Sequence, residues 1–127
     1  MPSSLQIGRA GELLVQYKLL KQGIESAPLT TAAGTDLVAY SPRKKNAVTI
    51  QVKSNFQPHP AGGKGKAALG WWLPDRPVTD LFALLDLSKD RIWLFKASEI
   101  PKLAQQHSGT RHHLYMYDDP TVKVGKG

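Results

Sequence analysis

A nearly unbroken apolar run at residues 80–87 constrains the fold of this chain more than any other feature. Its interior, Leu81-Phe82-Ala83-Leu84-Leu85, contains no polar residue. A strand that is apolar on both of its alternating faces is typical of a sheet that is covered on both sides. The turn-forming residues 88–90 and the strand-like residues 91–96 follow at once, which predicts a hairpin. The chain is therefore expected to fold in layers around a central sheet.

The other segments predict helices and strands around that sheet. A helix is expected at residues 5–22, capped by Ser3 or Ser4 and ended near Gly23. A short helix is expected at residues 98–106, with Ser98 as its cap. Strands are expected at residues 24–29, 36–40, 47–54 and 113–117, the last as an edge strand, and an irregular loop at residues 57–69. This order predicts one α/β domain over residues 1–127, with a mixed sheet flanked by helices.

The first helix carries two apolar stripes. One consists of Leu5, Gly8, Glu12, Val15 and Leu19, and the other of Ile7, Ala10, Leu14, Tyr17 and Leu20. Such a helix is expected to be buried on both sides, either within the domain or against a partner subunit. Together with the adjacent Trp71 and Trp72, this surplus of apolar surface predicts a homodimer or a higher homo-oligomer.

Composition excludes several classes of protein and favours one kind of partner. The chain has no cysteine, so disulfides and thiolate metal sites are impossible. No signal peptide and no span long enough to cross a bilayer is recognisable, and a cytoplasmic protein without membrane contact is expected. Seventeen Lys and Arg against ten Asp and Glu give a net charge of +7. A small basic domain often binds nucleic acid, although a soluble protein of high pI would have the same balance.

Strand pairing brings three polar residues together. If residues 41–46 form the loop between two strands, Tyr40 lies opposite Ala47 and Asp36 lies opposite Gln51. Lys53 is two residues beyond Gln51 and shares its face. Asp36, Gln51 and Lys53 are therefore expected on one surface, and a slip of one residue would separate them.

Glu12 is expected to look onto the same surface. It is the one charged member of its helical stripe, and that stripe should face the sheet. A carboxylate there needs a cation, a metal ion or a hydrogen-bond donor, because burial of an unpaired charge is costly. Gly8 and Gly11 would let the helix approach the sheet closely. A simple ion pair with Arg9 or Lys18 is the alternative.

These motifs resemble the PD-(D/E)XK nuclease superfamily, which includes restriction endonucleases, Holliday junction resolvases and some intron homing endonucleases. The resemblance rests on Gly11-Glu12, Gly34-Thr35-Asp36 and Ile50-Gln51-Val52-Lys53, and it covers about the first half of the chain. It implies a restriction-endonuclease-like fold and a DNA endonuclease that depends on Mg²⁺ or Mn²⁺.

The resemblance also implies a role for each residue of the set. Asp36 would bind the metal directly, Gln51 would stand at the second ligand position, and the Val52 carbonyl would be a further ligand. Lys53 would orient or help deprotonate the attacking water and stabilise negative charge at the phosphate. Glu12 would bind metal through water or hold a second ion. Such oxygen ligands are those that Mg²⁺ prefers.

Two positions depart from the superfamily pattern. Gln51 stands where an acidic residue is usual, which removes one negative charge from the metal site, and Thr35 stands in place of proline. The first departure leaves two other functions open. The chain could be a nucleic-acid-binding module of the same fold without catalysis, or a structural protein that assembles through its first helix.

Other groups have weaker interpretations. Six basic residues are expected to contact DNA: Arg9, Arg43, Lys44, Lys45, Lys64 and Lys66. The alternative is that they are ordinary surface charges in contact with solvent. Of the adjacent Trp71 and Trp72, one is expected in the core and the other at the surface. His107, His112 and His113 match no common zinc spacing.

Overall fold

The computed structural model describes residues 1–61 and 66–117, and they form two sheets, one long helix and several short elements. The first sheet has five strands in the order β1-β2-β3-β6-β7. They are β1 (Glu25–Pro28), β2 (Leu37–Ser41), β3 (Asn46–Asn55), β6 (Leu81–Asp86) and β7 (Arg91–Lys96). Strands β3 and β6 are parallel and the other neighbours antiparallel, so the sheet is mixed, as expected.

The second sheet was not anticipated from the sequence. Its four strands have the order β4-β5-β9-β8. They are β4 (His59–Ala61), β5 (Lys66–Pro74), β8 (Gln106–Ser108) and β9 (Arg111–Tyr117). The expectation of an irregular loop at residues 57–69 is therefore wrong for the part that forms β4 and the start of β5. Every second residue from Leu69 to Leu73 is buried, a pattern typical of a strand. The many Pro and Gly residues just before it hide this pattern in the sequence.

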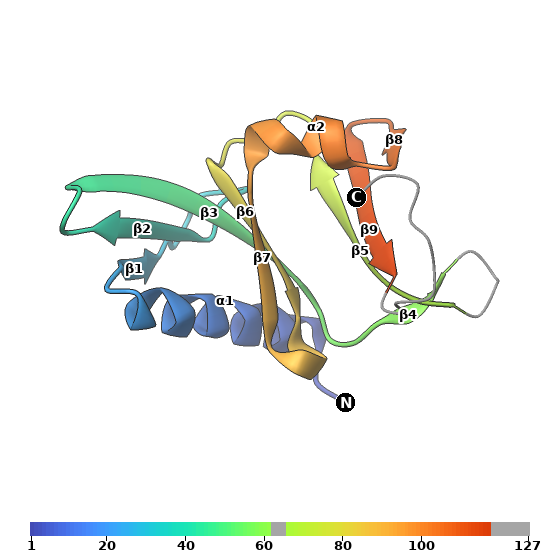
Figure 1. Ribbon diagram of the computed structural model, residues 1–127, viewed down its shortest axis with the longest axis horizontal. Coiled ribbons are helices and arrows are strands. Elements are labelled where there is room, and N and C mark those ends of the chain that lie inside the picture. Colours follow the sequence, from blue (N-terminus) through green and yellow to red (C-terminus); the bar gives the residue numbers. More distant parts are fainter. Residues whose placement is uncertain (62–65, 118–127) are drawn as a thin grey trace.

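Helix α1 (Ser4–Lys21) covers one face of the first sheet, and the second sheet lies toward the other (Figure 1). Ser3 caps α1, since its hydroxyl accepts from the backbone N–H of Gln6 and the Gln6 side chain accepts from Ser3 N–H. Both ends of the helix agree with the sequence prediction to within a residue.

Strand β6 contributes to both cores, as its two-sided apolar pattern predicts. Phe82 and Leu84 pack between the sheets against Leu69, Trp71, Leu73 and Leu114. Ala83 and Leu85 pack on the α1 side with Val15, Leu37, Ala39 and Ile50. The hairpin of β6 and β7 is confirmed, with the 3-10 turn η1 (Leu87–Lys89) between the strands.

The end of the chain differs from expectation in two ways. The helix expected at residues 98–106 is only the 3-10 turn η2 (Ala97–Glu99) followed by α2 (Ile100–Leu103), and Ser98 does not cap it. The helix ends at Leu103, and two residues later the chain joins β9: the Gln105 side-chain amide donates to the Tyr115 carbonyl and accepts from the Tyr115 N–H. Strand β9 is not an edge strand, since β5 and β8 flank it.

The first helix is not buried on both sides within the described chain. Gly11 and Val15 are buried, whereas Leu13, Tyr17 and Leu20 on the outer side are 50%, 55% and 55% exposed. The alternative that a partner covers the second side remains a prediction. No helix among residues 1–61 and 66–117 is long and apolar enough to cross a membrane.

Candidate active site

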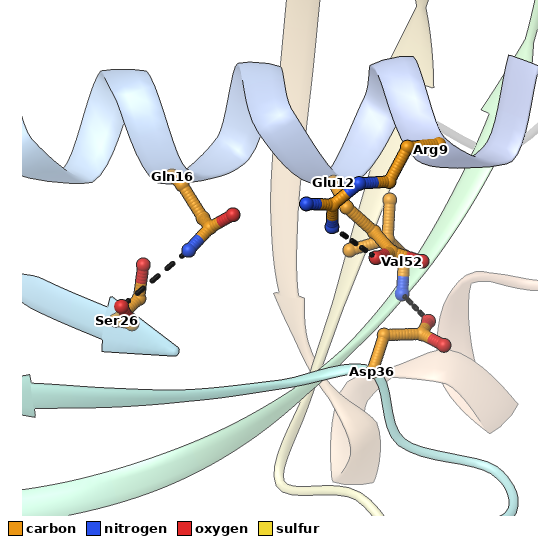
Figure 2. A network of polar contacts seen from close by, with 6 residues as sticks. All are labelled: Arg9, Glu12, Gln16, Ser26, Asp36 and Val52. Carbon is orange, nitrogen blue, oxygen red and sulfur yellow. Dashed lines mark hydrogen bonds and ion pairs between the residues drawn. The ribbon is translucent and has the colours of Figure 1, made fainter. Parts of the chain in front are cut away.

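Asp36 lies where β2 and β3 separate. The predicted register is confirmed, with Tyr40 opposite Ala47 and Val38 opposite Thr49. Strand β2 begins at Leu37. The N–H of Asp36 donates to the Ile50 carbonyl at 2.8 Å, and its carbonyl accepts from the Leu29 N–H at 2.9 Å on the side of β1. Its carboxylate oxygen Oδ2 then accepts from the Val52 N–H at 2.7 Å (Figure 2). The Asp36 carboxylate therefore accepts the hydrogen bond from the Val52 N–H that a main-chain carbonyl would accept in a regular strand pair.

The Val52 carbonyl shares this edge of β3. In an extended strand the N–H and C=O of one residue point to the same side. Because the Val52 N–H points to Asp36, its carbonyl oxygen faces the same gap between the strands. The backbone at Val52 therefore turns a carbonyl acceptor toward the same gap, and its role as a metal ligand stays a prediction.

A buried pair of threonines fixes the segment that leads into Asp36. Thr35 Oγ1 donates to the Ile50 carbonyl at 3.3 Å and lies 3.3 Å from the Thr79 hydroxyl. Both threonines are buried, and Thr79 also donates to the Leu81 carbonyl. Thr35 therefore ties the turn before Asp36 to β3 and to the start of β6, a role that a proline, without a hydroxyl, could not have.

Gln51 and Lys53 point toward the second sheet. In the parallel pairing Gln51 lies opposite Phe82 and Lys53 opposite Leu84. Paired residues share a face, and Phe82 and Leu84 belong to the core between the sheets. The Gln51 oxygen Oε1 is buried and has no hydrogen-bond partner within the described residues. Such an orphaned acceptor is unusual and is where a bound cation would be accommodated.

Glu12 approaches from the opposite layer, which corrects the expectation of a common surface. Helix α1 packs on the β3 face that carries Val52 and Ser54, since a Cβ added at Gly11 would meet both side chains. Gln51 and Lys53 lie on the other face. Figure 2 shows Glu12 extending from α1 toward Val52, with Asp36 reaching Val52 from the far side. Glu12 and Asp36 therefore approach Val52 from opposite sides, whereas Gln51 and Lys53 lie on the face of β3 that is turned away from α1.

Glu12 forms an ion pair with Arg9, which is the alternative to a metal ion or another partner at the sheet. The Arg9 guanidinium lies 3.3 Å from Glu12 Oε1, one helical turn earlier. Arg9 is 53% exposed and Glu12 24%, so solvent screens the pair and its contribution to stability is small. In residues 1–61 and 66–117, no group of three or more His, Cys, Asp or Glu side chains is arranged to hold a metal ion.

Of the other predicted basic residues, those on the β2–β3 turn lie away from this site. Arg43, Lys44 and Lys45 are exposed on the turn between β2 and β3, at the end of the hairpin remote from Asp36. Lys45 takes a positive φ of 55° there. Lys64 lies outside the described residues, and Lys66 begins β5. Contact of these residues with DNA remains a prediction.

A cleft of about 1100 Å³ opens beside Gln51 and Lys53. The second sheet and its loops form the opposite wall, which includes Trp72, Arg76 and Arg111. Sequence reasoning did not assign these two arginines, because they come from connections far from the nuclease-like motifs. Of the two tryptophans, Trp71 is buried and Trp72 is 38% exposed, as strand alternation predicted. The indole N–H of Trp71 is a further buried polar group without a partner among the described residues.

Comparison with known proteins shows a nuclease-like fold. The chain is similar to the solved structure of a bacterial homing endonuclease, I-Ssp6803I, with a TM-score of 0.64 and 16% sequence identity. The similarity covers 98% of this chain and 86% of that chain. No family model and no curated protein matches the sequence. The expected fold class, a mixed α/β architecture like that of an endonuclease, is thereby confirmed.

Proposed function

We propose that this protein is a metal-dependent endonuclease of the PD-(D/E)XK type that hydrolyses phosphodiester bonds in DNA. The observation that carries the proposal is the gap between β2 and β3, where the Asp36 carboxylate accepts from the Val52 N–H at 2.7 Å. The preceding residue, Gln51, has a buried side-chain oxygen without a partner among the described residues. The similarity of the fold to a homing endonuclease agrees with it. The net charge of +7 suits a polyanionic substrate.

The donor set fits Mg²⁺ or Mn²⁺. Asp36, the Gln51 oxygen and the Val52 carbonyl would hold the ion, and all are oxygen ligands of the type that hard divalent cations prefer. A bound ion would lower the pKa of a water and neutralise charge on the phosphate. Glu12 would act through water or at a second ion, in exchange for its exposed pairing with Arg9.

Lys53 would act on the substrate side of the site. It lines the cleft on the same face as Gln51, so a phosphate in the cleft would meet its ammonium group. During hydrolysis the water oxygen bonds to phosphorus, the bond to the leaving oxygen breaks, and negative charge grows on the phosphate oxygens. A lysine placed there orients the water and stabilises that charge.

The function is tested by cleavage assays on linear, branched and single-stranded DNA with Mn²⁺. Asp36→Asn is the sharpest variant, because the amide oxygen still accepts from the Val52 N–H while the charge is lost. We expect cleavage by the native protein and a loss of about 100-fold or more in Asp36→Asn. Asp90→Asn, in the exposed turn before β7, is the matched control and should cleave normally. Equal cleavage by Asp36→Asn would refute this site, and no cleavage of any DNA by the native protein would refute the activity.

A nucleic-acid-binding module without catalysis is the second function that an observation favours. Gln51 is neutral, and Glu12 is already paired with Arg9, so the site holds less negative charge than an acidic residue at position 51 would give. In this case DNA binding should depend steeply on salt and not on divalent metal. Selectivity for junctions or repair intermediates, and assembly as a homodimer, are further proposals that this fold allows.

A further inference from the structure

The cleft that Lys53 lines holds two further cations from other segments of the chain. Arg76 lies between β5 and β6, and Arg111 begins β9, where it pairs with Pro74. Both line the same cleft as Lys53. These three cations come from segments distant in the sequence, so their convergence is a property of the fold.

The charge of these cations is not neutralised within the described part of the chain. Among residues 1–61 and 66–117, neither Lys53, Arg76 nor Arg111 forms an ion pair. Asp75 is the one acidic residue of the described ranges that lines the cleft, and its Oδ2 lies 3.0 Å from His107 Nε2. The cleft therefore carries an excess of positive charge between two walls, which attracts anions.

Arg111 is held in place by an aromatic stack. Its guanidinium lies 5.2 Å from the centre of the Trp72 ring, and His113 stacks on the same indole at 4.3 Å with an interplanar angle of 13°. Gly70 makes room for this stack, because a Cβ there would approach His113 Nε2 to 2.9 Å. A guanidinium stacked on an aromatic ring keeps its N–H edges free for an anion. The partly exposed Trp72 therefore supports the Arg111 guanidinium from one side.

We propose that Arg111 and Arg76 form a second substrate-binding wall, which contacts the phosphate backbone of the DNA strand that Lys53 meets from β3. Trp72 is a positioning residue for Arg111. This inference rests on the proposed function for the identity of the ligand, but it does not need catalysis or metal. It assigns the affinity for DNA to the cleft and to the second sheet instead of the Arg43–Lys45 turn.

The test measures binding of a fluorescently labelled single strand, and of its duplex, to the full-length protein in EDTA by anisotropy. We expect Arg111→Ala to weaken binding about ten-fold for any sequence and to reduce the slope of log K against log salt by about one. Arg111→Lys keeps the charge and should retain the slope while it loses part of the affinity. Lys102→Ala, an exposed cation on α2, is the matched control and should leave both quantities unchanged.

The role of Trp72 is separated from a general loss of structure by a rescue. Trp72→Ala should weaken DNA binding several-fold, and Trp72→Phe should restore most of it, because a phenyl ring still supports the guanidinium. The proposal is overturned if Arg111→Ala and Arg76→Ala, folded by circular dichroism, bind both DNAs with the native affinity and salt slope. That outcome would leave metal-dependent cleavage intact. Conversely, a protein without cleavage whose binding depends on Arg111 would refute only the proposed activity.

Discussion

The carboxylate of Asp36 accepts a hydrogen bond from the backbone N–H of Val52 at 2.7 Å, so the same residue ends one strand pairing and marks the candidate metal site. This dual role has a practical consequence. A substitution that removes both charge and acceptor would disturb the ladder, whereas asparagine removes charge alone. Effects on activity and on folding can therefore be separated at this position.

Gln51→Glu is expected to strengthen metal binding. It adds one negative charge next to Asp36, and attraction between the site and a divalent ion grows with that charge. Titration calorimetry with Mn²⁺ should show affinity raised by about ten-fold, with cleavage raised in the same direction. Gln57→Glu, exposed beyond the end of β3, provides the control. Unchanged Mn²⁺ affinity in Gln51→Glu would count against Gln51 as a ligand.

Gly11→Ala is expected to destabilise the protein by about 1–3 kcal/mol, because the new methyl group would overlap the Ser54 hydroxyl and press on Val52. Gly8→Ala is the matched comparison on the same helix, since nothing lies within 4 Å of a Cβ there. It should stabilise α1 by roughly 0.5–1 kcal/mol. Urea unfolding of both variants measures the difference, and equal stabilities would contradict the close contact of α1 with β3.

Asp86→Ala is expected to cost about 2 kcal/mol or more, because it removes a buried acceptor that Ser88 and the partly exposed Arg91 share. The side chain is fully buried and accepts from the Ser88 N–H, the Ser88 hydroxyl and the Arg91 guanidinium. Denaturant unfolding checks the value. Asp90→Asn in the same turn should change stability by less than about 0.5 kcal/mol. If Asp86→Ala also changed the free energy of unfolding by less than about 0.5 kcal/mol, the hydrogen bonds of Asp86 would not stabilise the β6–β7 hairpin.

The stability of the protein is expected to fall in mildly acidic solution, partly through His113. Burial lowers the pKa of His113 below its ordinary value, so the folded state binds this proton less readily than the unfolded state. The contribution is complete above about pH 6.5 and is lost as the pH falls through that value toward the lower folded pKa. Thermal unfolding at several pH values should show a flatter profile for His113→Gln than for the native protein. An unchanged profile would assign the pH dependence to other groups, and His59→Gln on β4 is the control.

A homodimer through the outer side of α1 is expected, because Leu13, Tyr17 and Leu20 follow one another at helical spacing and remain half-exposed. Light scattering should give about twice the chain mass of 13.9 kDa. Leu13→Glu combined with Leu20→Glu should return the mass to that of one chain. If the native protein already has the mass of a single chain, this prediction is wrong.

The parts of the fold that local patterns control were predictable. Strand alternation around a short turn determined the pairing of Tyr40 with Ala47, and a two-sided apolar run located β6. A helical wheel, by contrast, does not say which face of a sheet the helix covers, so the layer of Glu12 was assigned wrongly. Arg76 and Arg111 carry no local signal at all. They line the same cleft as Lys53 only because the second sheet folds beside β3, and the first strands of that sheet lie in a segment rich in Pro and Gly.

The position of β6 in both cores has a consequence for how the molecule comes apart. Its odd and even residues pack in different layers. If either α1 or the second sheet detaches, the apolar side chains on one face of β6 become exposed to solvent. Partial opening would therefore weaken the remaining layer, and unfolding should be concerted. In amide hydrogen exchange, the backbone of β6 should be among the last to exchange, at a rate set by global unfolding.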